Sequence, residues 1–375
     1  MNVIFTCGGT GGHINPAIAV ANIWKERYPD SNILFIGAKD RMEEELVPKA
    51  GYQLYTIPAS GMSRKLTWES IKYNFRSVSY VLQSVGICKK VIRDFGADVV
   101  VGTGGYASFP ALLAASMLGI PTCVHEANAM PGLTTRMIAN RADRVLTCFP
   151  ESAKYYRHPE KVETVGMPVK REFIYTKKEQ ARKELGLDNR PLVVSAFGSQ
   201  GAKAMNTAVA ELFILEKKAG YPFQHIHATG SYGWEWMPDH VRQLGVDPEE
   251  NMGITMQEYI YNMPTLMAAA DIVISRAGAS SCNEIAASGT PCILIPSPNV
   301  TDNHQEKNAR ALSDKGAAVL LLEENCTPQA LMDSITSLLA DENRCKQMRS
   351  ALQKLCVLDS AEKLCDIIAE LAKGK

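Results

Sequence analysis

A glycine-rich turn beside a histidine lies close to the N-terminus. The turn Cys7-Gly8-Gly9-Thr10-Gly11-Gly12 follows a short apolar segment, and His13 comes directly after it. Glycines let a backbone approach a ligand closely, and the N–H groups of a helix expected to start near Asn15-Pro16 favour a phosphate. An imidazole can accept a proton at neutral pH. These residues predict anion binding beside a general base, with a merely structural turn as the alternative.

The turn matches neither of two common phosphate-binding sequences. It lacks the GxxxxGK[ST] of P-loop enzymes, and Ile14 stands where GxGxxG would have its last glycine. A P-loop ATPase and an ordinary dinucleotide-dependent oxidoreductase are therefore not supported.

Glycine-rich turns recur after two later strands. Gly102-Thr103-Gly104-Gly105-Tyr106 follows a strand predicted at 98–101, and Gly198-Ser199-Gln200-Gly201-Ala202 follows one predicted at 192–197. Ordinary strand-to-helix connections are the alternative for both. Because the third turn opens the second half of the chain, we expect a ligand that bridges two domains.

The second half also carries polar groups suited to a nucleotide. Glu284 follows a small-residue turn at 276–281, and a carboxylate there can accept hydrogen bonds from ribose hydroxyls. A dense polar stretch occupies 302–309, for which a solvated loop is the alternative.

Short β-branched runs alternate with helical patterns along the 375 residues, which is typical of parallel sheets covered by helices. The length favours about two domains, and Gly166-Met167-Pro168 is the expected linker. We predict domains at 1–165 and 166–357, with ligands at the carboxyl ends of the strands, in a cleft between the domains. Strands are predicted at 3–6, 33–36, 54–57, 98–101, 121–125, 144–148, 161–165, 192–197, 224–228, 253–256, 271–275, 292–295 and 318–321.

Composition narrows the class of protein. Lys and Arg together number 40, as do Asp and Glu, so no basic field predicts a nucleic-acid partner. The 10 cysteines include no C-x-x-C pair, as expected for reduced thiols in the cytoplasm. The N-terminus shows no secretory signal, and no apolar run reaches the ~18 residues of a spanning helix. We expect a cytoplasmic protein that can still touch a membrane.

These motifs, together with His125-Glu126-Ala127-Asn128, occur in one order from Val3 to about Lys315. In this combination the sequence resembles the bacterial N-acetylglucosaminyltransferases that convert lipid I into lipid II for peptidoglycan synthesis, cell shape and cell division. The resemblance implies an α/β GT-B fold, in which two Rossmann-like doubly wound parallel-sheet domains face each other across a cleft. It also implies that a final helix within about 358–375 packs back on the N-terminal domain.

The resemblance assigns roles to the matching residues. His13 and Glu126 are the two candidates for the catalytic base, and we favour His13 because it lies at the mouth of the expected cleft. Gly104, Gly105 and Tyr106 fall on the acceptor side. The donor, UDP-GlcNAc, is expected to contact Thr10, Gly11, Gly12, Asn128, Lys170, Ser199, Ile260, Ala279, Ser280, Glu284 and Gln305.

Two positions depart from the family's pattern. Lys170 stands where an arginine is usual, and it supplies a point charge without the planar fork, although Arg171 is adjacent. Phe197 stands where a further glycine is common. The sequence has no Asp-x-Asp pair, so neither a metal nor another cofactor is expected. Turn N–H groups, Ser199 and a basic residue would then stabilise the departing UDP.

The acceptor implied by the resemblance is lipid I, a polyprenyl-diphosphate muramoyl-pentapeptide held in the membrane. A helix expected within 64–82 has an apolar stripe edged by cations, which suits shallow insertion into an anionic inner membrane. Packing on its own core is the alternative. We expect a peripheral protein on the cytoplasmic face of the bacterial cell membrane. The stripe comprises Trp68, Ile71, Phe75, Val78 and Leu82, and the cations are Arg64, Lys65, Lys72 and Arg76.

Two other readings share the same donor residues. One is another GT-B enzyme that uses UDP-sugars, such as a lipid glucosyltransferase or a UDP-GlcNAc epimerase. The other is a regulatory subunit that binds a sugar nucleotide without catalysis. Release of UDP separates them, because an epimerase releases UDP without acceptor, a transferase requires acceptor, and a binding subunit releases none.

Overall fold

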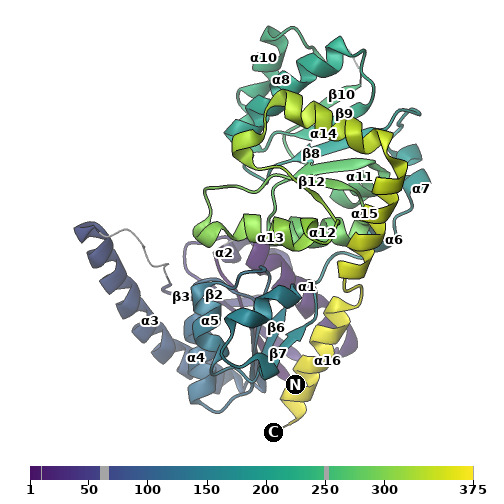
Figure 1. The fold of residues 1–375 in the computed structure, drawn as a ribbon. Helices are drawn as coiled ribbons and strands as arrows, with labels where there is room; N and C mark the ends of the chain where they lie inside the picture. The colour runs from purple at the N-terminus through teal and green to yellow at the C-terminus, as the bar shows by residue number, and fades with distance from the viewer. Residues whose placement is uncertain (10, 60–66, 249–252, 375) are drawn as a thin grey trace. The chain divides into compact units, whose positions relative to one another are not determined.

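The computed structural model describes residues 1–9, 11–59, 67–248 and 253–374, without the side chains of 68, 70–76 and 78. The chain forms two compact units. The N-terminal unit comprises Met1–Val169 with Asp359–Lys375, and the C-terminal unit comprises Lys170–Leu358. The division thus falls after residue 169, a little beyond the predicted boundary at 165. Each unit is described by itself (Figure 1).

The N-terminal unit is built on a parallel sheet of seven strands. Its strands are β1 (Asn2–Thr6), β2 (Asn32–Ala38), β3 (Gln53–Ile57), β4 (Val99–Gly102), β5 (Thr122–Glu126), β6 (Arg144–Thr147) and β7 (Val162–Thr164). They are arranged in the order β3-β2-β1-β4-β5-β6-β7. The helices of this unit are α1 (Gly11–Arg27), α2 (Glu43–Lys49), α3 (Trp68–Phe95), α4 (Ser108–Met117), α5 (Leu133–Ala139), η1 (Pro150–Tyr155), η2 (Pro159–Lys161) and α16 (Ser360–Lys373).

Apolar side chains fill both faces of this sheet. Along β1, Val3 and Phe5 enter one buried cluster and Ile4 enters the other, as the two-residue period of a strand requires. Helices α1 and α16 cover the first cluster, and α3 and α4 cover the second. The final helix α16 therefore belongs to the N-terminal unit, where Arg27 of α1 pairs with Asp366 at 2.8 Å.

The C-terminal unit is built on a parallel sheet of six strands. Its strands are β8 (Leu192–Ala196), β9 (Gln224–Ala228), β10 (Ile254–Gln257), β11 (Ile272–Ser275), β12 (Cys292–Leu294) and β13 (Val319–Leu320). They are arranged in the order β10-β9-β8-β11-β12-β13. The helices are α6 (Glu172–Tyr175), α7 (Lys178–Glu184), α8 (Lys203–Lys218), α9 (Ser231–Trp234), α10 (Met237–Gln243), α11 (Met263–Ala269), α12 (Ala279–Ser288), η4 (Thr301–Asn303), α13 (His304–Ser313), η5 (Glu323–Asn325), α14 (Pro328–Ala340) and α15 (Glu342–Leu355).

Every predicted strand is present, with ends shifted by two residues at most. The predicted start of the first helix is wrong. Helix α1 begins at Gly11 rather than near residue 15, and Pro16 lies inside it. The first N–H groups of a helix have no partner within the helix. The opening turn therefore gains little from residues of high helix propensity, and Gly11 and Gly12 can form it. The fixed φ of proline is compatible with the turn that follows.

Each sheet has one topological switch point, where the strand order reverses because the chain builds the sheet outward in one direction and then in the other. It lies between β1 and β4 in the N-terminal unit and between β8 and β11 in the C-terminal unit. Ligands of doubly wound sheets bind beyond the carboxyl ends of the strands at this point. The three glycine-rich turns follow β1, β4 and β8, so each unit presents its turns where a ligand is expected.

Within the described residues, no helix is both long enough and apolar enough to cross a membrane.

Candidate active site

His13 lies in the first turn of α1 and is held by the turn after β4. Its Nδ1 lies 3.0 Å from the carbonyl oxygen of Thr103, and the Thr103 hydroxyl donates to the carbonyl oxygen of His13 at 2.7 Å. A carbonyl oxygen can only accept, so Nδ1 carries a proton, and in the neutral ring Nε2 then keeps its lone pair. Among the described residues, Nε2 has no hydrogen-bond partner. This tautomer can accept a proton from a ligand hydroxyl.

The first two glycine turns pack directly against each other. A Cβ on Gly104 would come within 2.7 Å of His13 Nδ1, and one on Gly105 would come within 2.1 Å of the Gly8 carbonyl oxygen. Both glycines also have positive φ values. Their lack of side chains is therefore required by the protein itself, whatever ligand binds there. Tyr106 follows them and is half exposed.

The predicted donor residues of the first turn are described in part. Gly11 and Gly12 open α1, where unpaired N–H groups favour an anion, and Thr10 lies outside the described residues. The N–H of Gly9 is already bound, because it donates to the Glu43 carboxylate at 3.1 Å. The turn is thus only partly available to a ligand.

Glu126, the rival candidate for the base, accepts three hydrogen bonds. Its Oε1 accepts from the backbone N–H of Asn128 at 3.0 Å and from the Asn128 side chain at 3.1 Å. Its Oε2 accepts from the N–H of Gly132 at 3.1 Å. The carboxylate is buried and holds the loop after β5. This geometry suits a residue that positions Asn128 better than one that takes a proton.

His125 is a scaffold residue. Its Nε2 donates to the Gly166 carbonyl oxygen at 2.8 Å, and the ring is buried. Burial lowers the pKa of His125, an effect that the hydrogen bond to Gly166 partly opposes.

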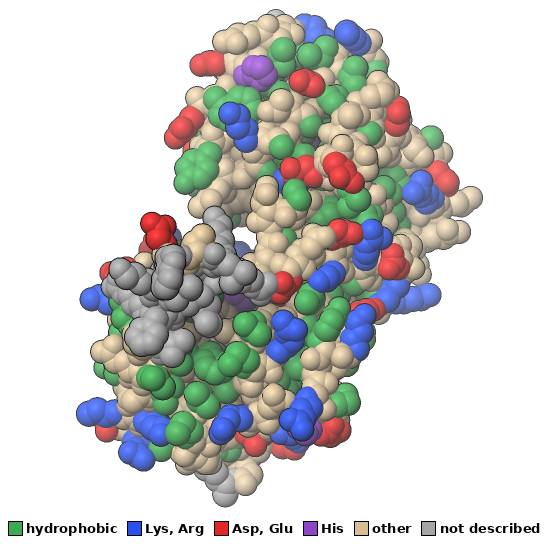
Figure 2. Space-filling view, turned by 60° about the vertical axis from the view of Figure 1, so that its left-hand side comes forward, with side chains coloured by type: hydrophobic (Ala, Val, Ile, Leu, Met, Phe, Trp, Pro, Cys, Tyr) green, Lys and Arg blue, Asp and Glu red, His purple; other side chains and the backbone are tan. Residues whose placement is uncertain are grey.

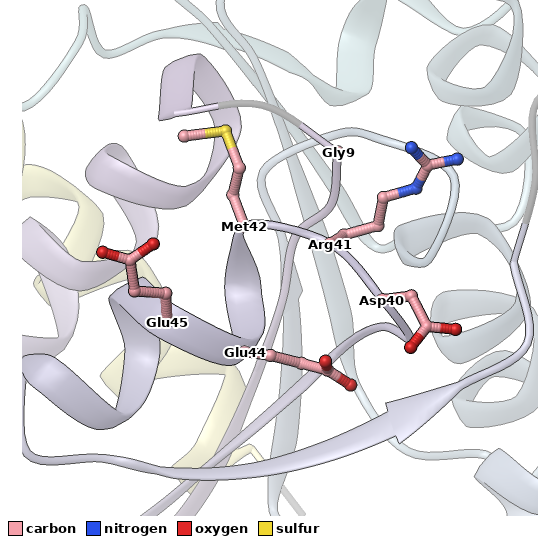
Figure 3. A pocket seen from close by; sticks show the side chains of 6 residues that line it. All are labelled: Gly9, Asp40, Arg41, Met42, Glu44 and Glu45. Atoms are coloured by element: carbon pink, nitrogen blue, oxygen red, sulfur yellow. The ribbon is translucent and has the colours of Figure 1, made fainter.

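A hollow of about 650 Å³ lies beside the first turn of the N-terminal unit. Figure 3 shows Asp40 and Arg41 on one side of it and Met42 and Glu45 on the other. Among the residues that the structure describes, none of the predicted site residues lines this hollow. Its remaining lining residues are Gly9 and Glu44.

In the C-terminal unit, the turn after β8 is braced by the turn after β9. The N–H of Ser231 donates to the Ser199 carbonyl oxygen at 3.1 Å. A Cβ on Gly201 would come within 2.0 Å of the Thr229 carbonyl oxygen, so this position also requires glycine. Ser199 itself is exposed, whereas Phe197, which replaces the family's further glycine, is buried below the turn.

The turn after β11 leads into α12, which carries Ala279, Ser280 and Glu284. Loss of water around the Glu284 carboxylate raises its pKa to about 7, and the nearby charge of Lys170 opposes that rise. Lys170 is therefore close enough to act on this carboxylate. A carboxyl group in this state changes charge near neutral pH, and it needs hydrogen-bond donors to stabilise its charged form.

Gln305 and Ile260 are the two other predicted donor residues of this unit. Gln305, on α13, accepts the N–H of Ser297 through Oε1 at 2.9 Å, which leaves its Nε2 as the donating end. Asn308, one turn on, ties α13 to the turn before α12 through the Ala277 carbonyl oxygen at 3.1 Å. Ile260 follows β10 and is buried, with the exposed Tyr261 next to it.

Sequence reasoning missed two groups of residues. Thr103 and Glu43 support the first turn through contacts that join distant parts of the chain, and only the order of the strands could have paired them with it.

The second group is a fully buried chain of hydrogen bonds in the C-terminal unit. Glu216 bonds His225 Nδ1 at 2.7 Å, and Ser195 Oγ lies 2.8 Å from His225 Nε2 and 2.7 Å from His227 Nδ1. Alternating polar residues in β9 were its only signal.

The N-terminal unit also exposes apolar side chains on neighbouring helices. Figure 2 shows hydrophobic side chains gathered on this unit, with Lys and Arg side chains around them. In this unit α3, α4 and α5 pack in sequence, and each of them exposes at least one large apolar side chain. Of the predicted stripe, Leu82 is 71% exposed, while Arg64, Lys65 and the side chains of the other members lie outside the described residues. The exposed apolar side chains include Leu82, Met117, Leu133 and Met137.

Two doubly wound parallel units, each with glycine turns at its switch point, define the GT-B fold. Residues 3–147 match the glycosyltransferase family 28 N-terminal domain, and residues 192–364 match the glycosyltransferase family 28 C-terminal domain. The chain belongs to glycosyltransferase family 28.

Relatives match the chain from end to end. One from Acetivibrio thermocellus is 41% identical over 376 residues, covering 100% of this chain and 99% of the relative. One from Halalkalibacterium halodurans is 38% identical over 374 residues, covering 100% of both. Each is named UDP-N-acetylglucosamine--N-acetylmuramyl-(pentapeptide) pyrophosphoryl-undecaprenol N-acetylglucosamine transferase. The resemblance seen in the sequence is confirmed.

Solved structures agree with this assignment. The crystal structure of MurG from Acinetobacter baumannii is 25% identical, has a TM-score of 0.77, and covers 98% of this chain and 99% of its own. A UDP-GlcNAc 2-epimerase from Neisseria meningitidis, bound to UDP-GlcNAc, is 16% identical with a TM-score of 0.65 and covers 99% of this chain and 100% of its own. This second likeness shows the fold alone.

Proposed function

We propose that the chain is an inverting N-acetylglucosaminyltransferase that moves GlcNAc from UDP-GlcNAc to the C4 hydroxyl of the muramoyl sugar of lipid I, giving lipid II. The observation that carries this proposal is the end-to-end match to relatives named for this transfer, at 38–41% identity. The epimerase reading has only a fold-level likeness in its favour.

His13 is the proposed base. With its proton on Nδ1 and held by Thr103 at 3.0 Å, its Nε2 takes the proton of the C4 hydroxyl as the oxygen attacks the anomeric carbon of GlcNAc. The bond from that carbon to the diphosphate oxygen breaks, and UDP leaves with the electron pair. Attack from the face opposite UDP inverts the anomeric centre.

The donor is proposed to bind mainly at the switch point of the C-terminal sheet. Glu284 would accept hydrogen bonds from the ribose hydroxyls, and Gln305 would donate from Nε2 to the sugar. Ser199 and the charge of Lys170 would face the diphosphate, with the N–H groups of Gly11 and Gly12. Asn128, held by Glu126, would contact the transferred sugar. The remaining proposed contacts are Thr10, Ile260, Ala279 and Ser280 to the donor, and Gly104, Gly105 and Tyr106 to the acceptor.

A peripheral position on the cytoplasmic face of the cell membrane is the second part of the proposal. Lipid I carries a polyprenyl chain, so its diphosphate lies at the membrane surface. The exposed apolar side chains on α3, α4 and α5 and the cation-edged stripe of the sequence support contact with an anionic membrane.

Release of UDP with and without acceptor tests the proposal. UDP-GlcNAc is incubated with the protein alone and with a short-chain lipid I analogue, and UDP is measured. We expect release that depends on the analogue. Release without it would indicate an epimerase or a hydrolase, and no release in either case would indicate a protein that only binds the donor.

A further inference from the structure

A buried carboxylate lies directly beneath the first glycine turn. Glu43 is the first residue of α2, and its side chain is 0% exposed. Its Oε1 accepts the N–H of Gly9 at 3.1 Å and the N–H of Ala38, the last residue of β2, at 3.0 Å. One oxygen therefore ties the turn after β1 to the end of the neighbouring strand.

The surrounding glycines make room for this side chain. A Cβ on Gly8 would lie 3.1 Å from Glu43 Oε1, and a Cβ on Gly37 would lie 2.9 Å from the Glu43 Cβ. Both distances are shorter than ordinary van der Waals contact. A side chain at position 8 or 37 would therefore collide with Glu43, and the two glycines leave room for it.

The second oxygen of the carboxylate is buried, and within the described residues it has no hydrogen-bond partner. A buried carboxylate oxygen without a partner is costly. An apolar side chain could fill the same space without that cost, but it could not hold the two N–H groups. The hydrogen bond from the Gly9 N–H therefore accounts for a carboxylate at this position.

We propose that Glu43 is a positioning residue for glycosyl transfer, because its hold on the Gly9 N–H fixes the path of the chain into α1 and hence the place of His13. Gly9 has a φ of 87°, and α1 begins at Gly11, two residues before His13. Thr103 holds the His13 side chain and backbone from the other side. This inference rests on the proposed function, since it gives His13 a task in transfer.

Substitutions of Glu43 test the proposal through the kinetics. Glu43→Ala removes both acceptors, and we expect kcat to fall on the order of 10²-fold, as small misplacements of a catalytic group do. The Kd of UDP should rise by no more than about tenfold, the loss of one to two average hydrogen bonds, because Gly11 and Gly12 supply only part of the proposed diphosphate contacts. Glu43→Gln keeps an oxygen that can accept both N–H groups, so kcat should recover to within about fivefold of the parent. Glu44→Gln, the exposed neighbour, is the matched control and should leave kcat unchanged.

Hydrogen exchange gives a readout that does not depend on activity. Mass spectrometry of the peptide that contains Gly9 should show faster exchange in Glu43→Ala, parent-like exchange in Glu43→Gln, and no change in Glu44→Gln. If Glu43→Ala does not fold, Glu43→Asp replaces it, because a side chain shorter by one methylene cannot reach both N–H groups.

Three results would overturn the inference: unchanged kcat in Glu43→Ala or Glu43→Asp, unchanged exchange at Gly9, or a loss in Glu43→Gln as large as in Glu43→Ala. Equal losses of UDP affinity and kcat would also overturn it, because they would indicate that Glu43 stabilises the fold in general and does not position His13. An inactive parent protein would instead contradict the proposed function, and with it a task for Glu43 in transfer; the exchange measurement would then show only whether Glu43 holds the Gly9 N–H.

Discussion

At the scale of single residues, His13 is the side chain on which the proposed chemistry depends. Its Nδ1 is bound to Thr103 at 3.0 Å, so the ring is oriented before any ligand arrives. His13→Ala removes the base, and we expect kcat with a lipid I analogue to fall by about 10²- to 10⁴-fold. The Kd of UDP, measured by calorimetry, should change little. Collapse of UDP binding with normal turnover of the bound complex would make His13 a donor-site residue.

Glu126 is expected to behave differently. Because its carboxylate accepts three N–H groups, Glu126→Gln loses one charge-assisted set of bonds but keeps the side-chain shape. The net change is about 1–3 kcal/mol, expressed as a raised KM for UDP-GlcNAc and a lower melting temperature. Its kcat should exceed that of His13→Ala. The opposite order of the two kcat values would assign the base to Glu126.

Glu284 should make donor binding depend on pH. Its pKa is raised to about 7, so the free protein loses the carboxylate as the pH falls below 7. A protonated carboxyl accepts ribose hydroxyls poorly, and the affinity for UDP-GlcNAc, whose phosphates do not titrate in this range, should therefore weaken as the pH falls from 8 to 6. Calorimetric titration across this range measures the effect. In Glu284→Gln the affinity should be weaker and nearly independent of pH, and a parent-like pH profile in that variant would contradict the role of Glu284.

At the scale of elements, the sequence predicts the sheets well and the contacts between turns poorly. Strands such as Gln224–Ala228 were predicted to the residue, because β-branched runs bounded by turn residues are a local signal. Helix α1 begins earlier than Pro16 predicts, because Gly11 and Gly12 form its opening turn. The roles of Gly105 and Glu43 were not predicted, because each depends on a partner more than 30 positions away that the fold brings close.

On the donor side of the site, too, the sequence predicts the elements but not the contacts between distant residues. Placement of Ser199 and Glu284 beside the switch point followed from the alternation of strands and helices. The proximity of Lys170 to Glu284 was not predicted, since it requires the first residue of the C-terminal unit to reach α12. Local patterns identify elements, whereas side-chain pairs depend on how elements pack.

The buried hydrogen-bond chain between β8, β9 and α8 should make the C-terminal unit sensitive to acid. Burial and neighbouring His225 lower the pKa of His227 from 6.5 to about 3. The unfolded chain therefore binds a proton first as the pH falls from 6.5 toward 3. The free energy of unfolding should decrease over this window by up to about 1.4 kcal/mol per pH unit from this group.

Chemical denaturation of the parent and of His227→Phe at several pH values tests this expectation. The variant should show a shallower pH dependence, and His240→Phe, a partly exposed histidine of the same unit, should keep the parent slope. Identical slopes in all three proteins would show that His227 is not the acid-sensitive group.

At the scale of the whole molecule, the proposed acceptor, a membrane lipid, would place the N-terminal unit at a membrane surface. Trp68→Ala combined with Phe75→Ala removes two aromatic side chains from the proposed membrane stripe. Each contributes about 1.5–3 kcal/mol when fully buried, so binding to anionic phosphatidylglycerol vesicles should weaken at least about tenfold. Sedimentation with vesicles measures this, and Tyr175→Ala, an exposed aromatic of the C-terminal unit, is the control. Unchanged binding with a lower melting temperature would assign the stripe to the core.

The proposed roles are divided between the two units. The proposed base is carried by the N-terminal unit and most of the proposed donor contacts by the C-terminal unit, so neither unit holds all the groups that transfer requires. Full-length agreement with relatives of the same length fits this division of tasks.

Transfer of labelled GlcNAc is the measurement that tests the central claim most directly. The protein is incubated with UDP-GlcNAc, radiolabelled in the sugar, and a short-chain lipid I analogue, and the lipid fraction is separated by chromatography. We predict label in a lipid product with a new β-linked GlcNAc on the C4 oxygen of the muramoyl sugar, and far less product with His13→Ala. Bound UDP-GlcNAc without any labelled lipid would contradict the claim that lipid I is the acceptor.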